Sequence, residues 1–293
     1  MPGHLTSRKS VKWGFLLPAL GYLALMAILP LVWTLTLSLM KWHANTMPKP
    51  VWVGLDNYKY FLFEDPRFWH DLGFTVMYVG ISVSVELVIG LVMAWLLSQR
   101  FKGKNFFRVV YLIPMACPPI AVAFLWRMML HPDIGVLNSM LKLIGLHGVK
   151  WTTDPRIAPF TLIMVDVWEW TPFMFLALLA AFQSLPTELY QAAAVDGANA
   201  WQMFKNLTLP LITPVIVTIS LIRAIDAFKL FELVFGITGA GPGGATESLS
   251  YYTYLIGMKW FKLGRGAAIS WLFLIILLIL AIILISRFKK QRT

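Results

Sequence analysis

The chain has 293 residues, of which 58% are hydrophobic and only 13% are charged, and its mean hydropathy is +0.71. Soluble domains carry about 25% charged residues, so this composition excludes a soluble protein and leaves room for about six membrane spans. The net charge of +11 therefore concerns orientation in a membrane rather than a nucleic-acid partner. The single cysteine, Cys117, excludes a disulfide or a cysteine-based metal site within the chain.

Six apolar segments predict an all-α polytopic membrane protein with one transmembrane domain over residues 1–293. The first segment is about 26 residues long, which exceeds the apolar region of a cleaved signal peptide. The third contains Pro114, Pro118 and Pro119, so we expect a kinked helix inside a bundle, where neighbouring groups satisfy the freed carbonyls. The expected spans cover residues 15–40, 72–97, 109–130, 158–182, 211–235 and 266–285.

The connections differ in their density of basic residues. If the N-terminus is cytoplasmic, the short inner segments carry twelve Lys and Arg residues, against ten in the longer outer loops. Positive charge concentrates on the cytoplasmic side of membrane proteins. This pattern predicts that both termini and the mixed stretch 185–210 are cytoplasmic.

The stretch 185–210 has the pattern of a helix, a sharp turn and a second helix. We expect Pro186 and Thr187 to open the first helix, with Thr187 as its N-cap, and Gly197 to end it. Asn199 is the expected cap of a short second helix that ends near Asn206. Pro210 marks entry to the next span. A carboxylate at a helix C-terminus costs ~0.3–1 kcal/mol, so we expect Asp196 to bond the amides that start the second helix.

This stretch resembles the EAA loop of ABC-importer permeases, the cytoplasmic segment that docks into the ATPase subunits. The family pattern is Glu-Ala-Ala, then a glycine, then an apolar residue followed by Leu-Pro. The matching residues here are Gln191, Ala192, Ala193, Gly197, Leu209 and Pro210. Gln191 stands where the family has glutamate, so an amide would replace the usual charge. Glu188 and Asp196 complete the expected coupling loop. The alternative is an ordinary re-entrant or interfacial helix pair.

Two further motifs resemble elements of the carbohydrate-uptake branch of this family: residues 53–58 (VGLDNY) after the first span and residues 239–244 (GAGPGG) after the fifth. The resemblance implies a type I importer that works by alternating access in a bacterial or archaeal cytoplasmic membrane. It also implies three partners: a second, homologous permease subunit, a dimer of ATP-binding subunits and an extracytoplasmic substrate-binding protein. A sugar, oligosaccharide, polyol, glycerol phosphate or sulfonated sugar all remain open as solutes.

Charged residues inside or near the fourth and fifth spans have two interpretations, because a charge at the bilayer centre usually faces a bundle interior or a water-filled path. One is a translocation path, and the other is a set of salt bridges that hold spans or subunits together. Both stay open for Asp226 and Lys229, whereas the salt bridge is favoured for Arg223 and Glu232. Glu86 is expected to form an interhelical hydrogen bond. The candidate path consists of Asp166, Trp168, Glu169, Trp170, Asp226, Phe228 and Lys229.

No enzymatic chemistry is predicted. The sequence has no G-x-x-x-x-G-K-[ST] motif, and its five histidines have neither metal-ligand spacing nor a nucleophile partner. We therefore expect no cofactor and no metal, with ATP hydrolysis on separate subunits. The competing class is an autonomous secondary transporter or channel, in which intramembrane carboxylates such as Asp166 and Asp226 would couple ions.

Overall fold

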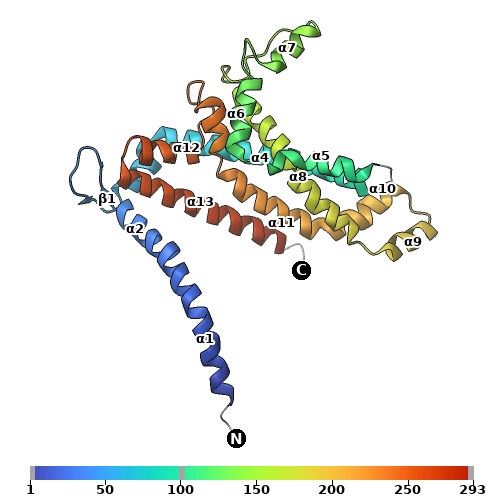
Figure 1. The fold of residues 1–293 in the computed structure, drawn as a ribbon, viewed down its shortest axis with the longest axis horizontal. Coiled ribbons are helices and arrows are strands. Elements are labelled where there is room, and N and C mark those ends of the chain that lie inside the picture. Colours follow the sequence, from blue (N-terminus) through green and yellow to red (C-terminus); the bar gives the residue numbers. More distant parts are fainter. Residues whose placement is uncertain (1–3, 99–102, 290–293) are drawn as a thin grey trace. The chain divides into compact units, whose positions relative to one another are not determined.

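The computed structural model describes residues 4–98 and 103–289, and it is predominantly helical (Figure 1). The chain ends and residues 99–102 of the expected basic connector lie outside the described residues. The chain divides into two compact units, Met1–Pro66 with Thr253–Ile275 and Arg67–Tyr252 with Ile276–Thr293.

The first unit contains the N-terminal apolar helix and a short hairpin. Its elements in chain order are α1 (His4–Leu23), η1 (Ala24–Ile28), α2 (Leu29–Ser38), β1 (Met40–Lys41), β2 (Val51–Trp52), α3 (Asp56–Lys59), η2 (Tyr60–Glu64) and η5 (Leu255–Lys259). The strands β1 and β2 pair antiparallel. Helix α13 (Leu263–Lys289) begins in this unit and ends in the other.

The motif at residues 53–58 anchors the end of the first apolar helix. Asn57 is buried, and its Nδ2 donates to the backbone oxygens of Ser38 and Met40, each at 2.9 Å. Ser38 is the last residue of α2, where the helix supplies no amide to its carbonyl, and Met40 lies two residues beyond it. The motif therefore has a structural role in closing this helix.

The second unit carries the remaining helices. They are α4 (Pro66–Ser98), α5 (Lys104–Ala116), α6 (Pro119–Met129), α7 (Val136–Leu143), α8 (Ala158–Gln183), α9 (Thr187–Val195), α10 (Ala200–Met203), η3 (Phe204–Thr208), α11 (Leu209–Phe228), η4 (Val234–Thr238) and α12 (Leu249–Tyr254). Helix α8 is the most buried of the long helices, and it packs against α5 and α11.

Five helices in the described residues are long and apolar enough to cross a membrane, and α5 with α6 forms a sixth span if the bent pair is counted as one. The expected kink in this pair is confirmed as a bend of 96°. Cys117 and Pro118 have extended backbones, with ψ of 143° and 132°. Each precedes a proline, which disfavours the helical conformation. The consecutive prolines thus break the helix completely.

A close approach at Gly90 joins α4 to α8. A Cβ atom at this position would lie 2.7 Å from the Cβ of Met174, a distance that real side chains do not adopt. Glu86 lies one helical turn before Gly90 and therefore faces the same neighbour. Because Gly90 has no side chain, α4 approaches α8 closely, and the Glu86 carboxylate lies on the side of α4 that faces α8.

Helix α11 differs from expectation at both ends. It ends at Phe228 rather than near residue 235, so Lys229 lies outside it. At its start, α10, η3 and α11 follow one another without a break over Ala200–Phe228. Pro210 lacks a backbone N–H, and the wider π-helical turn η3 precedes it, so the second helix of the stretch 185–210 continues directly into the span.

The glycine-rich turn at residues 239–244 leads into a hydrogen-bonded loop. Ser248 Oγ donates to the backbone oxygen of Leu230 at 2.5 Å, and Thr246 Oγ1 donates to that of Gly241 at 2.6 Å. Arg67 donates to both oxygens of the buried Glu247 carboxylate, at 2.6 and 2.7 Å. These contacts hold the segment that follows α11 in place.

Candidate solute path and coupling surface

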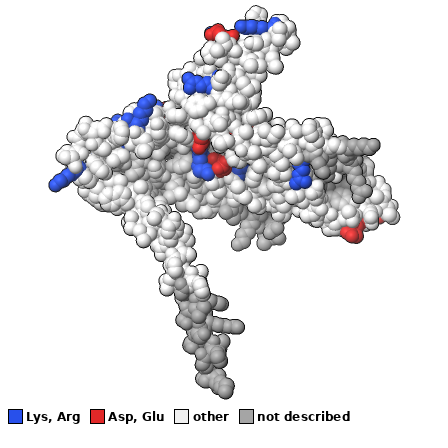
Figure 2. All heavy atoms as spheres, viewed as in Figure 1, with Lys and Arg blue, Asp and Glu red and all other residues white. Residues whose placement is uncertain are grey.

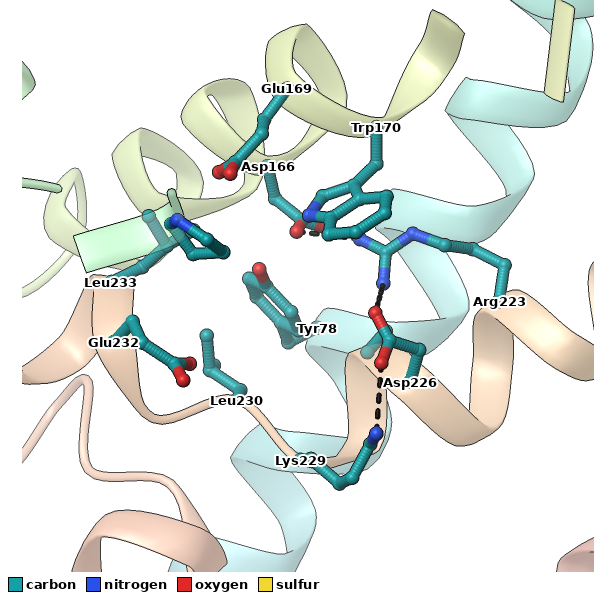
Figure 3. A pocket seen from close by; sticks show the side chains of 12 residues that line it. Tyr78, Asp166, Glu169, Trp170, Arg223, Asp226, Lys229, Leu230, Glu232 and Leu233 are labelled. Atoms are coloured by element: carbon teal, nitrogen blue, oxygen red, sulfur yellow. Dashed lines mark hydrogen bonds and ion pairs between the residues drawn. The ribbon is translucent and has the colours of Figure 1, made fainter. Parts of the chain in front are cut away.

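A polar cavity of about 320 Å³ lies in the second unit, between α4, α8, α11 and the segment after α11 (Figure 3). On the face seen in Figure 2, one group of acidic and basic side chains lies among the uncharged side chains of these helices, and other charged side chains lie farther away. The polar and aromatic lining consists of Tyr78, Asp166, Glu169, Trp170, Arg223, Asp226, Lys229 and Glu232.

Helical spacing explains how one helix supplies three of these side chains. Asp166, Glu169 and Trp170 are three and four residues apart on α8, which places them on one face. Figure 3 shows all three directed from α8 towards the cavity. Because α8 is enclosed by its neighbours, this polar face is buried and has to be matched by charges on other helices.

Arg223 supplies that match from α11. Its guanidinium donates to both oxygens of Glu86, from Nε at 2.9 Å and from Nη2 at 3.0 Å. Nη2 also donates to Asp166 Oδ1 at 2.6 Å. The Arg223 side chain is only 2% exposed. We call Arg223, Glu86 and Asp166 the buried network. It joins α4, α8 and α11, as the salt-bridge interpretation of Arg223 and the interhelical hydrogen bond of Glu86 predict.

A second ion pair lies at the rim of the cavity. Lys229 Nζ is 2.9 Å from Asp226 Oδ1, and the two side chains are 57% and 40% exposed. Asp226 Oδ2 is also 3.6 Å from Arg223 Nη1, so the rim pair continues the buried network towards solvent. Such an exposed pair contributes little to stability.

Glu169 has no such partner. The residue is 1% exposed, and neither carboxylate oxygen has a hydrogen-bond partner among the described residues. Asp166 Oδ2 and the Tyr78 hydroxyl oxygen are likewise buried without one. Buried polar groups in proteins are normally satisfied, so this cavity contains free hydrogen-bonding capacity.

The structure does not bring every candidate path residue into the cavity. Asp166, Glu169, Trp170, Asp226 and Lys229 line it. Trp168 lies on another face of α8 and contacts the Trp126 ring at 5.4 Å between ring centroids. Phe228 lines a separate apolar pocket with residues of α4 and α11. Helical spacing separates Trp168 from the polar face, because positions two apart do not share a side.

Three further residues line the cavity although the sequence did not predict them as part of the path: Tyr78, Arg223 and Glu232. Tyr78 lies in an apolar span, where an aromatic residue has the pattern of an ordinary core position. Glu232 lines the cavity with an exposed side chain and forms no ion pair within the described ranges. Glu232 therefore does not join two spans of this chain within the described residues.

The coupling stretch, residues 185–210, has well-defined local geometry. Gly197 adopts φ of +79° after α9. The amide of Ala198 donates to the Ala193 oxygen at 2.9 Å, and the Gly197 amide donates to the Ala194 oxygen at 3.1 Å. This is the Schellman arrangement, which satisfies the last carbonyls of a helix and favours glycine at the left-handed position. The predicted glycine stop is confirmed.

The start of the second coupling helix is also confirmed. Asn199 Oδ1 accepts from the Gln202 amide at 2.9 Å, and Gln202 Oε1 accepts from the Asn199 amide at 2.8 Å. This reciprocal pair is a capping box. Tyr190 and Thr208 link the two arms of the stretch through their hydroxyl groups, 2.8 Å apart.

Thr187 and Asp196 differ from the local predictions. Thr187 is the first residue of α9 and provides no side-chain cap, because the extended Pro186 occupies the cap position. Asp196 is itself the last, capping residue of α9, and its exposed side chain forms no hydrogen bond to the second helix in the described structure. Asn199 already satisfies the amide that Asp196 was expected to bond.

The coupling stretch exposes both polar and apolar groups. Glu188, Gln191, Ala192, Asp196, Gly197 and Pro210 are exposed, whereas Ala193 and Leu209 are half-buried. Val195 and Trp201 are 89% and 68% exposed. Large exposed apolar side chains beside polar ones are typical of a surface that contacts another protein or a membrane interface.

A buried polar cavity among apolar helices long enough to span a membrane is typical of polytopic membrane proteins that move solutes or ions. Residues 86–291 match the family of binding-protein-dependent transport system inner membrane components. The chain is 37% identical to a trehalose/maltose transport system permease protein of Thermococcus litoralis, over 99% of this chain and 100% of that protein. It is 32% identical to a sulfoquinovosyl glycerol transport system permease protein of Agrobacterium fabrum, over 87% and 82% of the two chains.

The fold is also similar to that of a solved ABC transporter. A solved bacterial ABC transporter involved in the import of the acidic polysaccharide alginate aligns with a TM-score of 0.84, at 24% identity, over 97% of this chain and 96% of that chain. The chain therefore belongs to the family of binding-protein-dependent transport system inner membrane components. It is a multi-pass permease subunit of an ABC importer, and this assignment is favoured over an autonomous secondary transporter or channel.

Proposed function

We propose that this chain is one of two homologous permease subunits that carry a carbohydrate or carbohydrate-like solute across the membrane. The observation that carries the proposal is the 37% identity, over almost the whole chain, to a trehalose/maltose permease. The motifs at residues 53–58 and 239–244 support the same branch of the family. A binding protein delivers the solute on the outer side, and a dimer of ATP-binding subunits drives the cycle.

The polar cavity is the proposed solute path. Asp166, Glu169 and Trp170 present hydrogen-bonding groups and an aromatic surface from α8, while Asp226 and Lys229 lie at its rim. We centre the path on these residues, because Trp168 and Phe228 lie outside the cavity. The buried network beside the cavity holds its three helices together.

The coupling stretch is the proposed docking surface for the ATP-binding subunits. Its exposed groups lie on two short arms joined by the Gly197 turn, and Ala200–Phe228 continues from the second arm into a span. A push on this arm therefore acts directly on the helix that carries Arg223 and Asp226. The proposal places the coupling stretch and both chain termini in the cytoplasm and ATP hydrolysis on the separate subunits.

Uptake into vesicles that contain the complete importer tests the proposal. We expect uptake of a carbohydrate to require ATP and the binding protein, and to be insensitive to the collapse of ion gradients. Uptake that persists without ATP but stops when the ion gradient collapses would contradict it.

Asp196→Lys tests the docking surface separately from folding. A cation at the C-terminus of α9 interacts favourably with the helix dipole, by ~0.3–1 kcal/mol, so the substitution should not weaken the helix. We expect the variant to insert normally and to lose uptake, because the charge on the docking surface is reversed. Wild-type uptake at equal expression would rule out a docking role for this position.

A further inference from the structure

The polar cavity contains more buried acceptors than its own donors satisfy. Both oxygens of Glu169 and Oδ2 of Asp166 are buried without a hydrogen-bond partner among the described residues. Glu169 is only 1% exposed, yet its side chain points from α8 into the cavity (Figure 3). An ionised or neutral carboxyl group in such a place needs a partner, and a solute with hydroxyl groups would provide one.

The two cations of the lining already have carboxylate partners. Arg223 bonds Glu86 and Asp166 at 2.6–3.0 Å. Lys229 Nζ lies 2.9 Å from Asp226 Oδ1. An anionic solute would therefore have to displace an existing ion pair in order to gain a cation.

The formal charge around the cavity is also acidic. The lining contains two cations, Arg223 and Lys229, and four carboxyl groups: Asp166, Glu169, Asp226 and Glu232. Even when Glu169 carries a proton, three lining carboxylates outnumber the two cations. The local field therefore repels an entering anion.

We propose that the polar cavity binds uncharged polyhydroxyl solutes through Glu169 and the free oxygen of Asp166, and that it discriminates against solutes that bear carboxylate, phosphate or sulfonate groups. This inference rests on the proposed function of the chain as a carbohydrate permease. Among the solutes that the sequence leaves open, it selects neutral sugars, oligosaccharides and polyols over glycerol phosphates and sulfonated sugars.

Direct binding to the assembled importer, without the binding protein, tests the cavity itself. The probes are maltose and trehalose as neutral solutes and glucuronate and glycerol 3-phosphate as anions, with binding detected by saturation-transfer NMR. We expect signals from the neutral probes that exceed those of the anions at least fivefold. Comparable signals from both classes, or no signal from any probe, would overturn the inference.

Variants of Glu169 assign the binding to this side chain. Glu169→Leu should lower the maltose signal at least fivefold, because it removes both acceptors at similar size. Glu64→Gln is the matched control: Glu64 is an exposed acid at the end of η2 and should leave binding unchanged. An unchanged maltose signal in assembled Glu169→Leu would overturn the inference.

Glu169→Gln keeps the test decisive if the leucine variant fails to assemble. The amide retains an acceptor at the same size, so the maltose signal should stay within twofold of wild type, and a fivefold loss would overturn the role of Glu169 as an acceptor. Glu232→Gln removes an exposed carboxylate of the lining, so the ratio of glycerol 3-phosphate to maltose signal should rise at least threefold. An unchanged ratio would overturn the charge selection. ATP-dependent uptake tests the proposed function separately from the solute preference of the cavity. Neutral probes that bind without any ATP-dependent carbohydrate uptake would contradict the proposed function instead.

Discussion

The buried network and the coupling stretch show opposite uses of polar residues within one unit. In the network, Arg223 is 2% exposed and bonds carboxylates on two other helices. In the coupling stretch, Asp196 and Gln191 are exposed, and the defined bonds are local ones made by Asn199 and the Gly197 turn. Polar side chains in the first region hold the bundle together, while those in the second remain available to a partner. Substitutions in the two regions should therefore fail in different ways.

The largest effect is expected at Arg223. Arg223→Met leaves the carboxylates of Glu86 and Asp166 buried without a cation. Removal of one partner of a buried ion pair costs ~3–5 kcal/mol of folding stability. We expect a marked loss of thermal stability in the purified importer. Lys229→Met removes the exposed rim pair and should cost only ~0.2–1 kcal/mol. Equal melting temperatures for the two variants would contradict the distinction between network and rim.

The next largest effect is expected where α4 approaches α8. Gly90→Ala places a Cβ atom 2.7 Å from that of Met174, and the overpacking should cost ~1–3 kcal/mol. Gly73→Ala on the same helix meets no atom within 4 Å and should be neutral or stabilising. Thermal unfolding of both variants measures the difference. If Gly90→Ala were as stable as Gly73→Ala, the position of Glu86 would not depend on this close approach.

Gly197→Val should uncouple transport without preventing insertion. A left-handed backbone costs a residue with a side chain ~1–2 kcal/mol, so the turn between the coupling helices should rearrange and uptake should fall to background. Gly145→Val provides the matched control, because Gly145 has φ of +80° after α7 and equally open surroundings. Its uptake should stay within twofold of wild type. Similar loss in both variants would assign the effect to strain rather than to coupling.

The smallest effect is expected at Asn199. Asn199→Ala removes the capping box and should cost about 1 kcal/mol, which corresponds to roughly fivefold faster amide exchange in the first turn after it. Asn199→Asp retains the acceptor and should exchange like wild type. Hydrogen–deuterium exchange of peptides covering residues 199–208 measures this. Unchanged exchange in Asn199→Ala would mean that contacts such as Tyr190 with Thr208 hold the second arm.

In the coupling stretch, the sequence predicted correctly the features that depend on neighbouring residues. The Gly197 stop and the Asn199 cap depend on groups within a few residues, so the sequence was sufficient for both. The Thr187 cap was wrong because Pro186, directly before it, takes the cap position. The sequence also did not predict that α10 continues into α11. The expected helix end near Asn206 is absent because the π-helical turn η3 keeps the chain helical up to Pro210.

The sequence by itself determined that this protein is an all-α membrane permease, because apolar length, basic density and the spaced docking motif are properties of the linear chain. Only the tertiary structure decided which charges meet. Glu86, Asp166 and Arg223 come from three helices, and their contact depends on the close approach at Gly90 and on the packing of α8 against α11. The tertiary structure also placed Glu169 in the polar cavity without a hydrogen-bond partner among the described residues, which its position in an apolar span could not reveal.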